Sequence, residues 1–358
     1  MTASERIKPL SRRRRRRVPA VTIHDVAARA GVSVATVSRV LNGKELVREE
    51  TSRQVVAAAK SLRYVPNVAA RSLSIRRSQT IGIVLPDVHG EFFSEVIRGV
   101  DVAARRAGYH ILVSGSHSDA GEMLKVLHTM HGRVDGIIVM APDVALASLR
   151  EPLAADIPLI LLNSTDDGLD SITIDNYGGA RTMMRHLAEL GHTRVAFIKG
   201  PPQNGDARER LRGFRHAMRA HGGGAARALE FDGDFTEESG YEAAKIIAAR
   251  KPRPTAIFAA NDSMAIGALA ALSGLGVDVP RAMSVAGFDD IPIARYVAPP
   301  LTTIRVDIAE LGRRAFALLL GALGHPSQKE WQRECVATSL VIRKSTDQRP
   351  DGRKGGGP

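Results

Sequence analysis

The sequence predicts an α/β domain of two doubly wound parallel-sheet lobes, preceded by an all-α helix-turn-helix headpiece. From about residue 79 onward, short apolar runs alternate with amphipathic helical stretches. Strands that alternate with helices in this way form βαβ units and a parallel sheet covered by helices on both faces. The apolar runs are too many for one small sheet, which predicts two lobes. Residues 22–64 carry only a compact helical pattern.

The strands are predicted from short apolar runs. A continuous apolar run of about 4–8 residues is typical of a strand buried on both faces. The runs are 81–85, 110–114, 136–140, 158–162, 194–198, 256–260 and 284–288.

The headpiece is predicted from helix starts and stops. Thr22 can cap a first helix together with Asp25, Gly31 ends that helix, and Ser33 can cap a second one. A third helix over about 48–62 closes the core. The inward-facing apolar residues are Ile23, Val26, Ala27, Ala30, Val37, Val40, Leu41, Val55, Ala59 and Leu62. Two short helices joined by a Gly-containing turn describe a helix-turn-helix, whose second helix enters the major groove of DNA. A plain helical hairpin is the alternative.

Composition narrows the function classes. The 358 residues carry a formal net charge of +12, which favours a polyanionic partner, either nucleic acid or an anionic membrane surface. The single cysteine, Cys335, excludes an intrachain disulfide framework and a cysteine-rich metal site. Neither a secretory signal nor a long apolar run is found, which predicts a cytoplasmic protein without membrane contact. The sequence has no GxxxxGK[ST] loop and no GxSxG elbow, so we expect no enzyme activity, cofactor or metal.

The chain is expected to divide into five segments. They are a disordered basic tail (1–20), the helix-turn-helix domain (21–64), a hinge helix and linker (65–78), the two-lobed domain for effector binding and dimerisation (79–343) and a flexible polar tail (344–358). The first segment contains six consecutive arginines, Arg12 to Arg17. Each phosphate they neutralise would add about −0.9 to the slope of log affinity against log salt, without adding sequence specificity.

Several strings resemble the LacI/GalR-type transcriptional regulators. They are VTIHDVAARAGVSVATVSRVLNG (21–43), LRYVPNVAARSL (62–73), ANDSMAIGA (260–268), GFDD (287–290) and PPLTTI (299–304), and the resemblance spans residues 21 to about 343. Arg48 and Arg63 depart from it, because the family commonly has serine and glycine there. The resemblance implies lobes like those of periplasmic sugar-binding proteins, with a small-molecule effector in the cleft between them. It also implies a repressor that binds a pseudo-palindromic operator as a homodimer, since the C-terminal tail lacks the leucine heptads of tetrameric members.

The resemblance assigns the DNA contacts. Arg39 is expected to read a guanine through its O6 and N7 atoms. Val34 either touches a thymine methyl or extends the buried stripe, and Leu73 either wedges into a minor-groove step or is a buried linker residue. The full predicted set is Thr22, Ser33, Val34, Ala35, Thr36, Ser38, Arg39, Asn42, Ala70 and Leu73. Of these, Thr22, Ser33, Thr36 and Ser38 are expected on phosphates.

The resemblance also assigns the effector contacts. They are Phe92, Phe93, Asn163, Arg208, Phe235, Asn261 and Asp289. A charged fork, an amide, a carboxylate and aromatic faces suit a polyhydroxylated ligand, so a sugar or sugar acid is the first prediction. A nucleoside or purine is the alternative. Phe92 and Phe93 could instead pack at a helix start, and Arg208 could pair with Asp206 or Glu209. A solute-binding protein without a transcriptional role is a further alternative, which the helix-turn-helix argues against.

Overall fold

The computed structural model describes residues 21–41, 47–64, 77–141, 157–165, 168–221, 229–324 and 331–349. The chain separates into two compact units with a boundary between residues 76 and 77. The predicted basic tail and three predicted DNA contacts, Asn42, Ala70 and Leu73, lie outside the described residues. No helix in the described part of the chain is long and apolar enough to cross a membrane.

The first unit contains the three predicted helices, α1 (Ile23–Ala30), α2 (Val34–Leu41) and α3 (Glu49–Ser61). The carboxylate of Asp25 accepts hydrogen bonds from the backbone N and the hydroxyl of Thr22 at 2.7 and 2.8 Å. Gly31 ends α1 in a left-handed conformation with φ of 66°. Ser33 caps α2, because its hydroxyl accepts the backbone N–H of Thr36 at 3.1 Å. The buried core consists of Val26, Ala27, Val37, Val55, Ala58 and Ala59.

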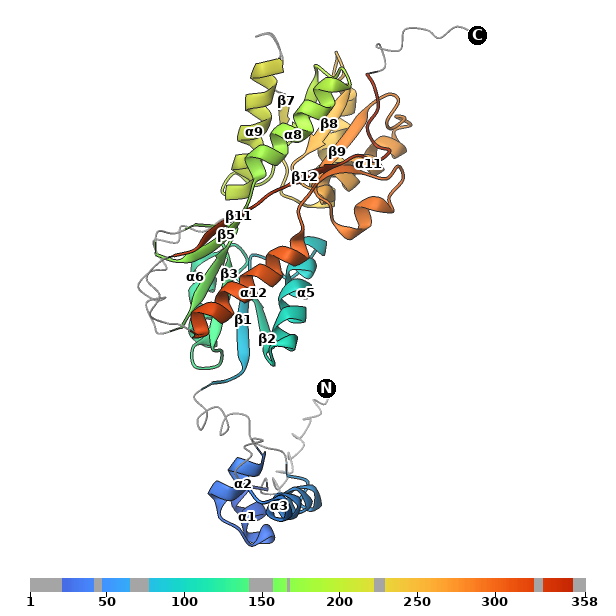
Figure 1. Ribbon diagram of the computed structural model, residues 1–358. Coiled ribbons are helices and arrows are strands. Elements are labelled where there is room, and N and C mark those ends of the chain that lie inside the picture. Colours follow the sequence, from blue (N-terminus) through green and yellow to red (C-terminus); the bar gives the residue numbers. More distant parts are fainter. Residues whose placement is uncertain are drawn as a thin grey trace, which may run out of the picture. The chain divides into compact units, whose positions relative to one another are not determined.

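The second unit contains two six-stranded sheets, one in each lobe (Figure 1). The first sheet is entirely parallel and has the order β11-β5-β4-β3-β1-β2. Its strands are β1 (Thr80–Leu85), β2 (His110–Gly115), β3 (Gly136–Met140), β4 (Leu159–Leu162), β5 (Asp170–Ile174) and β11 (Arg333–Val336). The second sheet has the order β12-β10-β9-β8-β6-β7, and only its β10–β12 pair is antiparallel. Its strands are β6 (Val195–Ile198), β7 (Leu229–Phe231), β8 (Ala256–Ala259), β9 (Ser284–Asp289), β10 (Thr302–Arg305) and β12 (Ser339–Val341).

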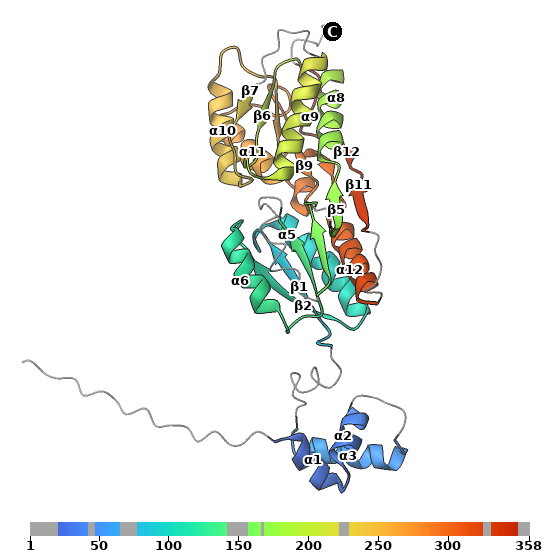
Figure 2. The same ribbon diagram turned by 90° about the vertical axis from the view of Figure 1, so that its left-hand side faces the viewer.

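Helices cover both faces of each sheet, as the doubly wound prediction requires (Figure 2). In the first lobe, α5 (Glu91–Arg106) and α12 (Ile308–Gly324) pack on one face and α6 (Ala120–Met130) on the other. Successive side chains of β1 point to opposite faces of the sheet, since Ile83 packs with α5 and Val84 with α6. In the second lobe, the pair α8 (Asn176–Glu189) and α9 (Gly205–His221) lies opposite the pair α10 (Glu237–Ala249) and α11 (Asp262–Gly274).

The chain passes between the lobes three times. It crosses between β5 and α8, returns between β10 and α12, and crosses again between β11 and β12. Each lobe is therefore built from segments that are distant in sequence.

The described residues contain all seven predicted strands and five others that were not predicted. These are β5, β7, β10, β11 and β12. Most are short or carry polar residues, as in Thr302–Arg305, so they lack a continuous apolar run.

The prediction of a flexible tail from residue 344 is wrong for residues 344–349. The Ser345 side chain is fully buried, and its hydroxyl donates to Val285 O at 2.6 Å and accepts from Thr302 N at 2.8 Å. The backbone N of Arg349 donates to Leu190 O at 2.9 Å. Polar composition misled the prediction because these polar groups bond to the second lobe rather than to water.

Candidate functional site

One face of α2 is exposed and carries two of the predicted DNA contacts, Ala35 and Arg39. Ala35 and Arg39 are both exposed and stand four residues apart, so they lie on the same side of the helix. Val34 is half-buried and packs against the headpiece core, which is the alternative that its spacing left open. Among the expected phosphate contacts, Thr22 and Ser33 are exposed at the starts of α1 and α2. Thr36 and Ser38 are half-buried on α2.

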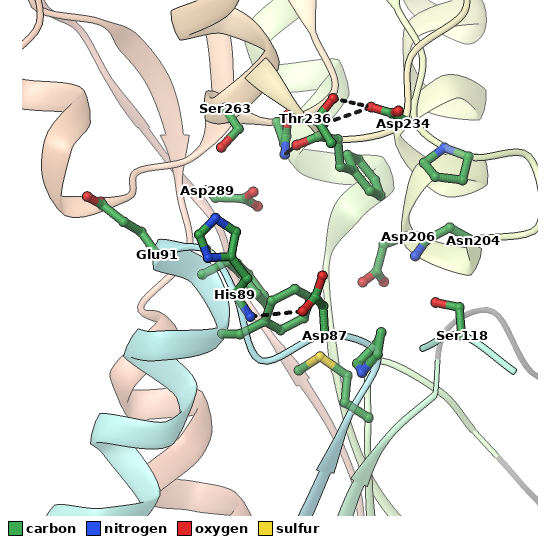
Figure 3. Close-up of a pocket in the computed structure, with 18 of the residues that line it drawn as sticks. Asp87, His89, Glu91, Ser118, Asn204, Asp206, Asp234, Thr236, Ser263 and Asp289 are labelled. Carbon is green, nitrogen blue, oxygen red and sulfur yellow. Dashed lines mark hydrogen bonds between the residues drawn. The ribbon is translucent and has the colours of Figure 1, made fainter. Parts of the chain in front are cut away.

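A cavity of about 470 Å³ lies between the two lobes of the second unit (Figure 3). This volume is within the usual range of about 300–1,000 Å³ for small-molecule sites. Six of the seven predicted effector contacts line the cavity, namely Phe92, Phe93, Asn163, Phe235, Asn261 and Asp289. The prediction missed other lining residues, which include Asp87, His89, Glu91, His117, Ser118, Asn204, Asp206, Arg210, Asp234, Glu237 and Ser263.

Backbone strain is concentrated on the cavity wall. Five lining residues other than glycine have positive φ angles: His117 (51°), Ser118 (53°), Asn163 (52°), Phe235 (73°) and Asp289 (114°). Left-handed conformations are uncommon outside glycine and cost free energy that the surrounding structure must offset. Such residues cluster at binding sites, which supports a functional role for this cavity.

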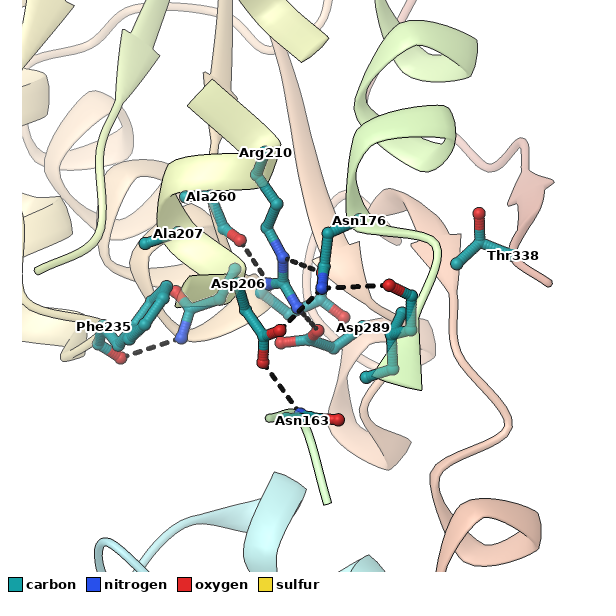
Figure 4. A network of polar contacts seen from close by, with 12 residues as sticks. Asn163, Asn176, Asp206, Ala207, Arg210, Phe235, Ala260, Asp289 and Thr338 are labelled. Carbon is teal, nitrogen blue, oxygen red and sulfur yellow. Dashed lines mark hydrogen bonds and ion pairs between the residues drawn. The ribbon is translucent and has the colours of Figure 1, made fainter. Parts of the chain in front are cut away.

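Arg210 is the centre of a buried polar network on the cavity wall (Figure 4). It is 3% exposed and its guanidinium pairs with Asp289 at 2.9 Å. The same group donates to the Asn176 amide oxygen at 2.8 Å and to Ala260 O at 2.6 Å. Its central carbon lies 3.9 Å from the centroid of the Phe288 ring. Each of the three guanidinium nitrogens is therefore bonded to another group of the protein.

Asp206 joins this network from the start of α9. Its carboxylate accepts one hydrogen bond from Asn163 at 2.8 Å and another from Asn176 at 2.7 Å. Asn163 follows β4 of the first lobe, so its bond to Asp206 links the two lobes across the cavity. Ile293 N, which donates to the Glu91 carboxylate at 3.0 Å, provides a second link.

Burial raises the pKa values of three acidic groups in and beside this network. It raises the pKa of Asp206 and that of Asp289 to about 6, although Arg210 opposes the shift in both cases. Burial and the neighbouring Asp289 raise the pKa of Asp262 well above its ordinary value. Asp262 accepts from the Thr303 hydroxyl at 2.6 Å and from Ile291 N at 2.9 Å, which fixes the loop that follows β9.

The assignment of Arg208 to the cavity is wrong. Arg208 is exposed, does not line the cavity, and donates to the carbonyl oxygens of Pro202 and Gln203. The alternative pairing with Asp206 or Glu209 is not seen either, because Asp206 bonds Asn163 and Asn176, and Glu209 bonds Arg212 at 2.6 Å. Two residues correspond to about 200° around a helix, so Arg208 and Arg210 point in nearly opposite directions.

A signal for Arg210 was present in the sequence. It falls within the buried stripe of α9 formed by Ala207, Phe214, Ala217 and Met218. A charged residue inside an apolar stripe is buried and therefore needs a partner of opposite charge.

The other predicted residues combine packing with access to the cavity. The rings of Phe92 and Phe93 lie edge to face with their centroids 5.7 Å apart. Both residues also pack against the core at the start of α5, which is the alternative given for them above. The amide of Asn261 caps α11, since it accepts from Met264 N and donates to Phe235 O, both at 2.9 Å. Among the described residues, no group of three or more His, Cys, Asp or Glu is arranged to hold a metal ion.

Each of the two units resembles a known family of protein domains. Residues 22–67 match the family described as bacterial regulatory proteins, lacI family, and residues 184–346 match a periplasmic binding protein-like domain. The HTH-type transcriptional repressor PurR of Pectobacterium carotovorum is 36% identical over 336 residues, which cover 92% of this chain and 98% of the relative.

The chain belongs to the lacI family of bacterial regulatory proteins.

Solved structures of this family show the same architecture. The lac repressor dimer bound to operator and the anti-inducer ONPF has a TM-score of 0.83 and 31% identity, over 92% of this chain and 99% of that one. The transcriptional regulator CelR in complex with cellobiose has a TM-score of 0.67 and 31% identity, over 91% of this chain and 99% of that one. These relatives are transcriptional regulators.

Family membership gives the two units their roles. This lacI-family member is a DNA-binding transcriptional repressor with a helix-turn-helix and a two-lobed domain that takes a small-molecule effector. Its α2 carries the exposed face that a helix-turn-helix presents to the major groove. Its cavity lies between the lobes, where an effector can bias their arrangement.

Proposed function

We propose that the protein binds a pseudo-palindromic operator as a homodimer and that a sugar or sugar acid in the cavity controls this binding. Residues 21–64 form the DNA-binding domain, 65–78 the hinge and 79 onward the effector-binding and dimerisation domain. The observation that carries the DNA-binding role is the exposed Ala35–Arg39 face of α2 in a lacI-family headpiece. The dimeric operator complex of the lac repressor supports the stoichiometry.

The full chain is expected to bind one pseudo-palindromic duplex as two protomers. A dimer places two recognition helices about one helical turn, or about 34–36 Å, apart, so a duplex with both half-sites binds far more tightly than one with a single half-site. Light scattering on the protein and on the complex, with duplexes selected from a random library, measures this stoichiometry. A stable tetramer at micromolar concentration, or equal affinity for single half-sites, would contradict the proposal.

Arg39→Ala is expected to weaken operator binding by about 1–3 kcal/mol and to relax specificity at one base pair of each half-site. The reason is that an exposed guanidinium can bond both acceptors of one guanine. Fluorescence anisotropy with every single-base operator variant measures the change. Arg53→Ala is the matched control, because Arg53 is also exposed on the headpiece but pairs with Glu49 along α3 at 2.9 Å. Equal losses of Arg39→Ala on operator and random DNA would mean that Arg39 contacts only phosphate.

The cavity supports a polyhydroxylated effector. Its polar groups converge from both lobes, as Asn163, Asp206 and Asp289 show, and the partly buried Phe92 and Phe235 add apolar surface on which a ring can stack. The relatives CelR, bound to cellobiose, and a regulator from Enterococcus faecium, bound to ribose, support the sugar class.

A nucleoside or purine is the second candidate, because the same aromatic surfaces can stack on a base. Thermal-shift measurements on the full chain with sugars, sugar acids, nucleosides and purines distinguish the two classes, since a ligand of the native state raises the unfolding temperature. A sugar that shifts the transition and also changes operator affinity supports the proposal. A shift by nucleosides or purines alone would replace it with the second candidate.

A further inference from the structure

The lining of the cavity carries a strong excess of negative charge. Of the residues that the structure describes, six acidic ones line the cavity, but only one arginine does, Arg210. The acidic residues are Asp87, Glu91, Asp206, Asp234, Glu237 and Asp289. The carboxyl groups of Asp87, Asp206 and Asp289 lie around the open space at the centre of Figure 3. A ligand that enters this space therefore meets a negative field in a partly desolvated site, where charge interactions are stronger than in water.

The positive charge that could offset this field is already used. Arg210 is almost fully buried and its guanidinium is shared between Asp289, Asn176 and Ala260 O. One guanidinium cannot neutralise both Asp206 and Asp289, so the buried centre of the network keeps an uncompensated carboxylate when both acids are ionised.

On the wall of the cavity, among the described residues, the amide oxygen of Asn163 is a buried acceptor that lacks a hydrogen-bond partner. Asn163 is 6% exposed, donates its amide N–H to Asp206, and its Oδ1 atom has no hydrogen-bond partner among the described residues. Figure 4 shows this oxygen directed away from Asp206. One amide N–H of Asn261 donates to Phe235 O. A buried acceptor without a partner is costly, and a ligand hydroxyl or N–H group can satisfy it.

Carboxylate and phosphate groups fit this site poorly for two independent reasons. They offer no hydrogen-bond donor to the Asn163 oxygen, and they place like charge beside Asp206 and Asp289. A hydroxyl group, by contrast, donates to the acceptors and carries no charge.

We propose that Asp206 and Asp289 make the cavity select against negatively charged ligands, so that the effector is a hydroxyl-rich molecule without a carboxylate or phosphate. This inference rests on the proposed function and narrows it, because it removes sugar acids from the proposed class. Asp206 is the specificity-determining residue, since Asp289 is paired with Arg210 and Asp206 has only neutral amide partners.

Matched pairs of ligands test the proposal on the full chain. The dissociation constant of each ligand is measured by calorimetry at pH 8. The pairs are glucose and glucuronate, galactose and galacturonate, ribose and ribose 5-phosphate, and guanosine and GMP. The neutral member of a binding pair is expected to bind about tenfold or more tightly than its anionic partner. In Asp206→Asn this ratio is expected to fall to a few-fold, because the variant removes the unpaired charge and lets the Asn163 oxygen accept from the new amide.

The Asp206→Asn variant is expected to fold, since Asn163 can rotate its amide and accept from the new side chain. Glu238→Gln is the matched control, because this carboxylate is exposed next to the cavity wall without lining it. The ratio should stay at the wild-type value in that control.

The outcomes separate this inference from the proposed function. An anionic ligand that binds as tightly as its neutral partner, or a ratio that Asp206→Asn leaves unchanged, overturns the charge selection and leaves a sugar effector in place. Binding of guanosine but not of GMP or any sugar overturns the sugar effector and supports the charge selection. A panel in which no member binds contradicts both.

Discussion

Arg210→Ala is expected to destabilise the two-lobed unit by about 3–5 kcal/mol and to abolish the response to effector. The substitution leaves Asp289 buried without its ion-pair partner, and it removes the donor that satisfies Asn176 and Ala260 O. Arg210→Lys is expected to recover only part of the loss, because an ammonium group cannot reproduce a planar fork that makes three contacts and stacks on Phe288. Thermal unfolding of the full chain and effector titrations of the operator complex measure both effects.

Arg208→Ala is the matched control for this experiment. The two arginines lie on the same helix, but Arg208 is exposed and donates only to nearby backbone carbonyls. Its removal should change the free energy of unfolding by no more than about 0.5 kcal/mol and leave the effector response intact. Loss of the response in Arg208→Ala, together with a normal response in Arg210→Ala, would reverse the assignment made from the structure.

The Arg210→Ala destabilisation is also expected to depend on pH. The pKa values of Asp206 and Asp289, about 6 in the folded protein, lie above the ordinary value of 3.8. The stability that these groups contribute is therefore fully present below pH 3.8 and is lost as the pH rises through about 6. Without Arg210 their pKa values rise further, so the variant should be least destabilised near pH 5 and most destabilised near pH 8. A destabilisation that is the same at both values would show that the guanidinium contributes packing rather than charge.

The elements that were easiest to predict from the sequence are those in which every residue is buried or in which the interacting groups are close in the chain. Runs such as Ile81–Leu85 are buried on both faces, so every residue is apolar and the strand is visible without any knowledge of its neighbours. The caps at Thr22 and Ser33 are equally local, because donor and acceptor lie three residues apart.

What could not be predicted depends on partners that are distant in sequence. Ser345 is polar and lies near the end of the chain, and only the groups at Val285 and Thr302 explain its burial. Asp206 could not be predicted for the same reason, because its hydrogen-bond partner Asn163 lies in the other lobe and is distant in sequence. Of the effector contacts that the resemblance supplied, Asn261 in ANDSMAIGA and Asp289 in GFDD line the cavity, whereas Arg208, in a stretch without such a motif, does not.

Val37→Asp is expected to unfold the headpiece and abolish operator binding, while the two-lobed unit remains folded. Val37 is fully buried on α2, in a core of only six buried residues. An unpaired carboxylate there costs about 4 kcal/mol or more, whereas a core of this size rarely supplies more than about 3–5 kcal/mol. The loss of operator affinity should therefore exceed that of Arg39→Ala, which removes a contact from a folded surface.

Val56→Asp is the matched control, since it makes the same change on the same unit at a valine that is 53% exposed. This variant should keep a folded headpiece, and its operator affinity should stay close to that of the wild type.

Calorimetric scans of the full chain follow the unfolding of the second unit, which shares no core with the first. Its transition should occur at the wild-type temperature in both variants. Wild-type operator affinity in Val37→Asp would show that α2 does not depend on this core, and a shifted second transition would show that the two units do not unfold independently.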